Sequence, residues 1–470
     1  MTFEKLSVPG LSDDELVTLN LCAEELDKKT PRNLLRSSHY DGKRAVQQIG
    51  SVIPPQYANI GLALGWAAKG VDGLARRCNL EKMIWADGDI ESLGMSELEE
   101  SNFLLSEISQ GRTDSLIHGV NYLITTKGDE AAGEPASLVH AKDALNAYGN
   151  WNARRRRLDD LLSVTSREDG KITGFVLYLD GLTINADKVD GKWQVDRSEH
   201  PWHVPADPLV YRPRGSRRMG KSRITRPVMS HVSSALRALV RLEGHMDVYT
   251  IPKLILLGAD ESIFKNADGS AKASWQIALG RTFGIPDDDD PQSLNPRADV
   301  KQFDATSPEP HLAQLNALAK LMARETDLPD SDFALTDMAN PTSADSYSAS
   351  RENLISEAEG AMDDWSVPIR RTVNRALAIQ SGLSAVPEAW GSIEAKWRSP
   401  IYLSKAAAAD AGAKQLGAVP WLAETEVGLE LLGLDEQQIR RAMADKRRAA
   451  GRAVVAALTP PASQANANGG

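Results

Sequence analysis

The segment from Ser343 to Gln380 carries the strongest periodic signal in the chain. Its apolar side chains recur every three or four residues, which is typical of a helix that buries one face. They are Leu354, Ile355, Ala358, Met362, Trp365, Ile369, Val373 and Ala376. Charged side chains at Glu352, Glu359, Asp363 and Arg370 fall on the opposite face. The pattern therefore predicts one long amphipathic helix.

The start of this helix is marked by local signals. The pair Asn340-Pro341 supplies a turn, and Thr342 or Ser343 offers a side-chain oxygen to cap the first backbone N–H groups. Pro368 falls inside the apolar pattern and removes one backbone hydrogen bond, so we expect a kink near Trp365. A continuous helix here would be about 55 Å long, which favours an assembly of copies packed side by side.

Size and composition indicate a large globular protein. The 470 residues allow about three domains, and the chain is 42% hydrophobic and 25% charged. Its longest apolar run, Leu254 to Ala259, is much shorter than the roughly 20 residues that a membrane span needs. The acidic start, Thr2 to Glu15, does not resemble a signal peptide. We therefore expect no membrane association and a cytoplasmic location before any assembly.

Cysteine content and net charge exclude further classes. Cys22 and Cys78 are too few for a disulfide framework or a thiolate metal site, as expected in a reducing compartment. The net charge of −10 is the wrong sign for a protein that grips nucleic acid over its whole surface. Any contact with DNA must be local or weak.

The period of the pattern changes along the chain. Residues up to about Gln110 have a helical period, and residues 119–212 alternate, with Asp180-Gly181 and Asp190-Gly191 as hairpin turns. From Pro227 two helices flank a compact insertion, and helical segments resume after Gln380. These signals predict an α+β fold that is predominantly helical, with an antiparallel meander.

Several short sequences occur in a characteristic order. They are Tyr40-Asp41-Gly42, Gly220 to Ile224, Leu328 to Phe333, Asn340 to Asp345, and Ala406 to Arg448. In this order and spacing the chain resembles the portal protein of tailed bacteriophages, of the long-tailed type. The resemblance covers nearly the whole sequence, although each stretch is short and degenerate.

The resemblance implies a ring of roughly twelve subunits with closed cyclic symmetry, placed at one vertex of the capsid. Double-stranded DNA would pass through it without sequence specificity during packaging and ejection. Implied partners are the terminase, the head-completion (adaptor) protein, and the major capsid and scaffold proteins. The implied location is the virion, with the host cytoplasm before assembly, and neither a cofactor nor an enzymatic activity is implied.

The same resemblance implies a domain map. It places a wing at 1–226, stem helices at 227–247 and 308–327, a clip at 248–307, a tunnel loop at 328–344, the long kinked helix at 343–380, a helical crown at 381–458 and a disordered tail at 459–470.

Candidate site residues follow from this map and from electrostatics. A channel that bound phosphates through Lys or Arg would hold DNA back, whereas an acidic lining lets it slide. The candidate tunnel-loop residues are Asp330, Asp332, Phe333, Asp337, Met338 and Asn340, and those of the tunnel helix are Glu352, Glu359, Asp363, Trp365 and Pro368. The candidate docking residues of the clip are Asp260, Glu261, Trp275, Asp287, Asp288, Asp289 and Asp290.

Other interpretations of these charges remain open. The acids of the long helix also suit a solvated face or the helix dipole. The basic runs Arg154 to Arg157 and Arg212 to Arg226 could meet DNA or acidic neighbouring subunits, or form a hydrated surface. The pair His200 and His203 has no third ligand nearby, and four adjacent carboxylates at 287–290 cannot converge on one ion, so neither favours a metal site.

Two alternative functions compete with the portal interpretation. Gly215 to Ser222 formally satisfies the phosphate-loop pattern of a nucleotide hydrolase. Pro227 would interrupt the helix that such a loop needs, and the chain lacks alternating strand and helix units. A scaffold or capsid component without a channel is the third possibility, and the loop followed by a kinked helix argues against it.

Overall fold

The computed structural model describes residues 4–43, 61–249, 253–257, 269–270, 299–303, 306–333, 351–401 and 405–458. The chain divides into two compact units, Met1–Arg398 and Ser399–Gly470. Its described elements are mainly helices together with four antiparallel sheets, which confirms the predicted α+β class.

The first unit begins with helices. They are α1 (Asp13–Tyr40), α2 (Trp66–Ala75), α3 (Met95–Asn102) and α4 (Leu104–His118), with strand β1 (Leu80–Trp85) and the short helix η2 (Ile90–Leu93) between α2 and α3. Helix α1 has a reciprocal capping box, in which the Ser12 side chain accepts from the backbone of Glu15 and the Glu15 side chain accepts from the backbone of Ser12. This sequence signal sets the start of the helix.

Two antiparallel sheets follow α4. The first has the order β3-β2-β9 and consists of β2 (Val120–Lys127), β3 (Ser137–Asp143) and β9 (Ala206–Val210), with the short helix η3 (Glu130–Ala132) between β2 and β3. The second is a meander of β4 (Ala147–Asn152), β5 (Arg157–Glu168), β6 (Lys171–Leu179), β7 (Leu182–Val189) and β8 (Lys192–Glu199).

The predicted meander is therefore confirmed. Asp190 and Gly191 both have positive φ, as a two-residue hairpin turn requires. The pair Asp169 and Gly170 forms the same kind of turn between β5 and β6, a signal that the sequence analysis did not use.

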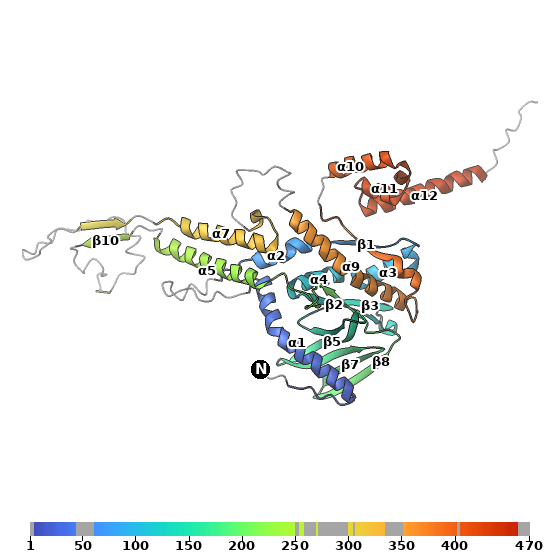
Figure 1. Cartoon of the computed structure of the whole chain (residues 1–470), viewed down its shortest axis with the longest axis horizontal. Coiled ribbons are helices and arrows are strands. Elements are labelled where there is room, and N and C mark those ends of the chain that lie inside the picture. Colours follow the sequence, from blue (N-terminus) through green and yellow to red (C-terminus); the bar gives the residue numbers. More distant parts are fainter. Residues whose placement is uncertain are drawn as a thin grey trace, which may run out of the picture. The chain divides into compact units, whose positions relative to one another are not determined.

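The elements of this region form four layers. Helix α1 packs on one face of the meander, the other face of the meander covers the three-stranded sheet, and α4 and α9 (Glu352–Gln380) cover the far side of that sheet (Figure 1). Alternation along β2 shows the arrangement: Val120, Tyr122 and Ile124 contribute to the cluster between the sheets, whereas Leu123 contributes to the cluster beneath the helices. Strand β2 is thus buried on both faces.

Helix α9 has the predicted amphipathic character. Every apolar residue of the predicted stripe is buried except Ile355, which is half-buried, and the helix continues through Pro368 to its predicted end at Gln380. It begins at Glu352 after Arg351, so the predicted start at Ser343 and its capping residues lie outside the described residues. The kink stays a prediction.

Two long helices flank the predicted insertion. They are α5 (Arg226–Tyr249) and α7 (Glu309–Thr326), which pack against each other and are followed by the short helix η5 (Asp330–Asp332) (Figure 1). Between them in sequence, β10 (Lys253–Leu257) pairs antiparallel with β11 (Asp299–Phe303).

The C-terminal boundary differs from the prediction. The short helix η6 (Glu388–Ser392) leads into β12 (Ile393–Trp397), which pairs antiparallel with β1 and buries Ile393 in the largest core cluster. Residues 381–398 therefore belong to the first unit, so the predicted boundary at Ser381 does not coincide with the division between the two units. Their apolar contacts with α9 and β1 hold them there.

The second unit is helical, as predicted. It consists of α10 (Lys405–Ala418), the short helix η7 (Pro420–Glu424), α11 (Glu426–Leu431) and α12 (Glu436–Leu458). Gly412 lies against the backbone of Leu431, where a Cβ would come within 2.0 Å of the carbonyl oxygen.

Residues 459–470 lie outside the described residues, and no helix in the described ranges is long and apolar enough to cross a membrane.

One half-buried acid in α4 makes the stability of the fold depend on pH. Burial, with Asp143 nearby, raises the pKa of the Asp114 carboxyl to about 7. The folded chain therefore keeps this proton between about pH 4 and pH 7, whereas the unfolded chain releases it. Through this group, stability falls as the pH rises through that range.

We predict that Asp114→Asn stabilises the protein at high pH. The amide keeps the size of the side chain and removes the buried charge, so the free energy of unfolding at pH 8 should rise by about 2 kcal/mol. This is half of the free energy that corresponds to the full rise in the pKa of Asp114. At pH 4 the variant and the parent should be nearly equal. Urea titrations at both pH values measure this difference, and Asp27→Asn, at an exposed position on α1, serves as the control. A pH-independent effect of Asp114→Asn would contradict the prediction.

Candidate functional site

A buried ion pair joins the two long helices to the layered region. The Arg223 guanidinium lies 2.6 Å from the Glu357 carboxylate, and both side chains are only 5% exposed. Tyr211 donates its hydroxyl hydrogen to the same carboxylate and accepts a hydrogen bond from Arg223 at 3.1 Å. Arg212 lies 3.0 Å from Glu357 at the solvent edge. We call Tyr211, Arg212, Arg223 and Glu357 the hub.

The hub also binds backbone carbonyl oxygens of two helices. Arg223 donates through Nε to the carbonyl oxygen of Gly70 in α2 at 2.6 Å, and through Nη2 to that of Thr326 in the last turn of α7. Burial disfavours its charge, but Tyr211 and Glu357 outweigh this cost and raise the pKa of Arg223. One side chain thus connects α2, α7, β9, α9 and the segment that leads into α5.

The hub explains part of the basic run from Arg212 to Arg226. Arg223 is buried in the protein, and Arg212 pairs with Glu357. The remaining basic residues of the run are exposed: Arg214, Arg217, Arg218, Lys221 and Arg226. Arg212 and Arg223 therefore have structural partners. The exposed basic residues could still contact DNA, contact acidic neighbouring subunits or form a hydrated surface, as the sequence left open.

The phosphate-loop interpretation of Gly215 to Ser222 is not supported by the geometry. The Lys221 N–H donates to the carbonyl oxygen of Tyr211, and the buried Ser222 hydroxyl donates to that of Ile117. A Cβ on Gly220 would come within 2.5 Å of two carbonyl oxygens. The preceding strand β9 pairs antiparallel with β2. The groups that would cradle phosphates are therefore used by the fold.

The first half of the predicted tunnel loop is held by contacts within the chain. The Asp332 carboxylate lies 3.5 Å from Lys69 and 3.9 Å from Arg351. Phe333 is 8% exposed and packs edge-on against Trp66, with ring centroids 5.9 Å apart. Phe333 is therefore packed in the core, where α2 supplies an aromatic partner for it.

The other residues of this loop divide into two groups. Asp330 is exposed and begins η5, whereas Asp337, Met338 and Asn340 lie outside the described residues. Lys69 and Arg351, which lie close to Asp332, come from outside the loop, so the sequence of the loop alone could not predict these contacts.

Residues of the predicted tunnel helix occupy both faces of α9. Glu352, Glu359 and Asp363 are exposed, whereas Trp365 is fully buried and lies 6.5 Å from the Trp397 ring. Pro368 is half-buried. The three acids form a line on the solvent side, one or two turns apart. Burial and the neighbouring Asp363 raise the pKa of Asp364 in the same stretch.

The predicted docking residues of the clip lie outside the described residues. This applies to Asp260, Glu261, Trp275, Asp287, Asp288, Asp289 and Asp290. The two paired strands that frame them, β10 and β11, are described, and their docking role stays a prediction.

The second basic run surrounds a turn between β4 and β5. Asn152 caps this turn by accepting from the backbones of Arg154 and Arg155, and Arg157 lies 3.6 Å from Asp180. His203 Nδ1 lies 2.7 Å from the same Asp180 carboxylate. His200 is instead 3.1 Å from the Thr183 hydroxyl, so the two histidines have different partners. The described part of the chain holds no cluster of three potential metal ligands.

Comparison with known proteins shows that the chain is similar to phage portal proteins. A model of the family described as "Phage portal protein, SPP1 Gp6-like" matches residues 19–451. The portal protein of Mycobacterium phage D29 is 24% identical over 422 residues, covering 88% of this chain and 84% of its own length. The portal protein of Mycobacterium phage L5 is 23% identical over 427 residues, covering 88% of this chain and 83% of its own length.

Solved structures with a similar chain come from gene transfer agent (GTA) particles. A chain in the neck of an empty GTA particle, computed with C6 symmetry, has a TM-score of 0.43 at 16% identity, and the match covers 83% of this chain and 92% of that one. A chain in the neck of a native GTA particle, computed with C12 symmetry, has a TM-score of 0.41 at 16% identity, covering 79% and 90%.

We predict that Arg223→Met destabilises the first unit strongly. It leaves the Glu357 carboxylate buried beside Tyr211 without its closest cation, and a broken buried pair costs roughly 3–5 kcal/mol. Arg212→Met removes a half-exposed partner of the same carboxylate and should cost at most about 1 kcal/mol. Urea unfolding followed by tryptophan fluorescence measures both.

A double variant tests whether the loss comes from the unpaired charge. Arg223→Met with Glu357→Leu removes both charges and should recover part of the loss, although the carbonyl oxygens of Gly70 and Thr326 stay without their donor. If the effects of the two single substitutions simply add in the double variant, the two side chains are not coupled as described.

Proposed function

Since the chain belongs to the SPP1 Gp6-like family of phage portal proteins, we propose that it forms a closed ring at one vertex of a capsid and conducts double-stranded DNA. The match to the family over residues 19–451 carries this proposal. The family is structural, so we propose no reaction. The resemblance implies about twelve subunits, a number that cyclic symmetry accommodates.

The distribution of charge on α9 supports the proposal that the ring conducts DNA. Glu352, Glu359 and Asp363 are exposed along one side of a helix whose other side is anchored in the core. If this side faces the channel, DNA meets like charge and no counterions are released on contact. We propose that these three acids, with Asp330, contribute to the lining and that contact with the duplex does not depend on base sequence.

The roles of the remaining elements follow from the domain map that the family resemblance implies. We propose that α5 and α7 form the stem, that the β10–β11 hairpin belongs to the clip, and that the elements up to β9 together with β12 form the wing. The second unit, Ser399–Gly470, would be the crown. The clip would dock the terminase during packaging and the head-completion protein afterwards, while capsid and scaffold proteins would contact the ring from outside.

The first test is the assembly itself. We expect the purified full-length chain to give class-averaged electron micrographs of rings with an open axis, because a conduit must enclose a hole. Compact monomers or closed shells under all assembly conditions would contradict the proposal and favour a scaffold or shell component.

The second test concerns the proposed acidic lining. Replacing Glu352, Glu359 and Asp363 by Lys adds three cations where phosphates would pass, so the ring should bind duplex DNA and packaging should slow. Three phosphate contacts make the affinity fall roughly fortyfold when the salt concentration rises fourfold. Binding titrations at two salt concentrations and a packaging assay measure the two effects.

A matched control places the same three substitutions elsewhere. Glu168, Asp196 and Glu199 are exposed acids on the meander, and their replacement by Lys changes the net charge equally. If both triple variants bound DNA with the same affinity and salt dependence, α9 would not line the channel. Intact rings in both variants, checked by electron microscopy, exclude misassembly as the cause.

A further inference from the structure

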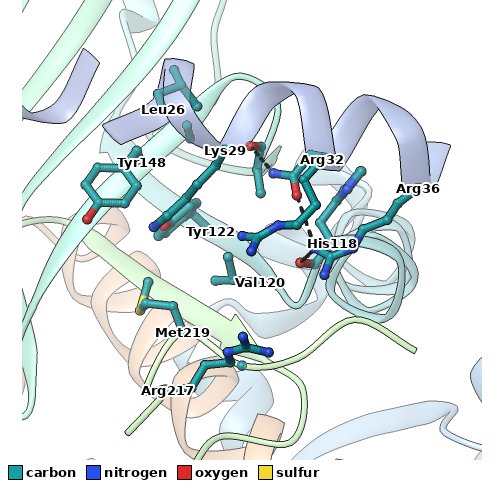
Figure 2. Close-up of a pocket in the computed structure, with 14 residues that line it drawn as sticks. Leu26, Lys29, Arg32, Arg36, His118, Val120, Tyr122, Tyr148, Arg217 and Met219 are labelled. Atoms are coloured by element: carbon teal, nitrogen blue, oxygen red, sulfur yellow. Dashed lines mark hydrogen bonds between the residues drawn. The ribbon is translucent and has the colours of Figure 1, made fainter. Parts of the chain in front are cut away.

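A cationic pocket lies between α1 and the turn that leads to Gly220. It is a cavity of about 140 Å³ whose walls come from α1, from the start of β2, from β4 and from the turn that contains Arg217 (Figure 2). Tyr122, Tyr148 and Met219 supply its apolar surfaces. Neither the channel nor the hub uses this pocket.

Four cationic side chains line the pocket. Lys29, Arg32 and Arg36 are spaced three and four residues apart, so they lie on one face of α1, and Arg217 comes from the opposite wall (Figure 2). No Asp or Glu is among the described residues that line it. The sequence had shown Arg217 only as part of a basic run, and the fold brings it to three cations from a distant helix.

Arg36 is held in a buried position close to two other cations. Burial, together with the charges of Arg32 and Arg217, lowers the pKa of Arg36 to about 10. Like charges gathered in one cavity raise the free energy of the folded chain. An anion that enters the pocket would relieve this repulsion.

Two hydrogen-bonding nitrogens at the pocket have no partner among the described residues. Arg36 donates through Nη1 to the carbonyl oxygen of His118 at 2.9 Å, which fixes its side chain, but its Nε has no partner. His118 lines the same pocket and is 8% exposed, and its Nδ1 has no partner either. Buried nitrogens of this kind are normally satisfied, and the Arg36 Nε–H is always a donor, so it points to a ligand with oxygen acceptors.

We propose that this pocket binds a phosphate-type oxyanion, held by Arg32, Arg36 and Arg217 with Lys29 at its edge. A phosphate group has several acceptor oxygens and up to two negative charges, which suits four cations and forked guanidinium donors better than a single carboxylate does. The inference goes beyond the proposed channel function and does not depend on ring formation, because all four cations belong to one chain.

Binding can be measured with inorganic phosphate and the purified full-length protein. Melting temperatures are recorded against phosphate concentration, with chloride at matched ionic strength as the reference. The parent protein should be stabilised in a saturable way. Arg32→Gln and Arg217→Gln should each weaken phosphate binding about tenfold, since each removes a charge-assisted hydrogen bond.

The neighbouring Arg218 provides a matched control. It is exposed in the same turn as Arg217 and lines a different pocket, beside Asp364 and Pro368. Arg218→Gln should leave phosphate binding unchanged. If Arg217→Gln and Arg218→Gln had equal effects, phosphate would be acting as a general counter-ion and the proposed site would be refuted.

The protein without phosphate gives a second, independent measurement. Because the cations repel one another, Arg32→Gln and Arg217→Gln should melt at the same temperature as the parent or higher at low salt. A purely structural role would lower the melting temperature instead. Destabilised variants that keep the full response to phosphate would overturn the proposal.

Two further probes identify the source of the anion. If a short 5′-phosphorylated oligonucleotide competes with phosphate and loses binding in Arg217→Gln, the site takes phosphates of nucleic acid. If the oligonucleotide does not compete, the site takes free phosphate. An acidic peptide that binds the pocket when phosphate does not would refute the proposal in favour of a carboxylate partner.

Discussion

The buried Arg223–Glu357 pair is the interaction on which the arrangement of the first unit depends. A guanidinium at 5% exposure is tolerated only when its donors are used, and here they reach the Glu357 carboxylate, the Tyr211 hydroxyl and the carbonyl oxygens of Gly70 and Thr326. These partners come from segments that are far apart in sequence. Any rotation of α7 against α9 would leave part of this set unsatisfied, so the hub couples the two long helices of the proposed stem to the layered region.

Helix α9 serves two purposes that require opposite surfaces. Its apolar side closes the core with Trp365 and Ile369, and its exposed acids carry the charge of the proposed channel lining. The adjoining loop behaves differently, because Asp332 is neutralised by Lys69 and Arg351 and Phe333 is taken into the core. In the described part of the proposed lining, negative charge therefore rests mainly on the rigid helix rather than on the loop.

Local signals in the sequence were sufficient to predict helices, strands and turns, but they did not predict which distant residues contact one another. Periodicity predicted the buried stripe of α9, and the Asp190-Gly191 pair predicted a hairpin, because both depend on neighbours within a few residues. The partner of Arg223 could not be predicted, because a charged residue in a basic run has the same local pattern whether it is solvated or buried. The same holds for Arg217, whose cationic pocket exists only after α1 has packed beside the turn. The residues that match the phosphate-loop pattern up to Ser222 likewise make contacts within the fold, and those contacts could not be predicted from the local sequence.

The pairing of β1 with β12 has a consequence for synthesis on the ribosome. The Trp85 indole donates to the hydroxyl of Ser392, 307 positions later in the chain, and Ile393 completes the same core. Contacts so distant in sequence form slowly and late. A nascent chain that has emerged only as far as α9 still exposes the β1 edge and the apolar surface that β12 covers, so the core of the first unit is completed only after β12 has been synthesised. A product truncated before β12 would therefore lack a complete core in the first unit, which disfavours its entry into an assembly.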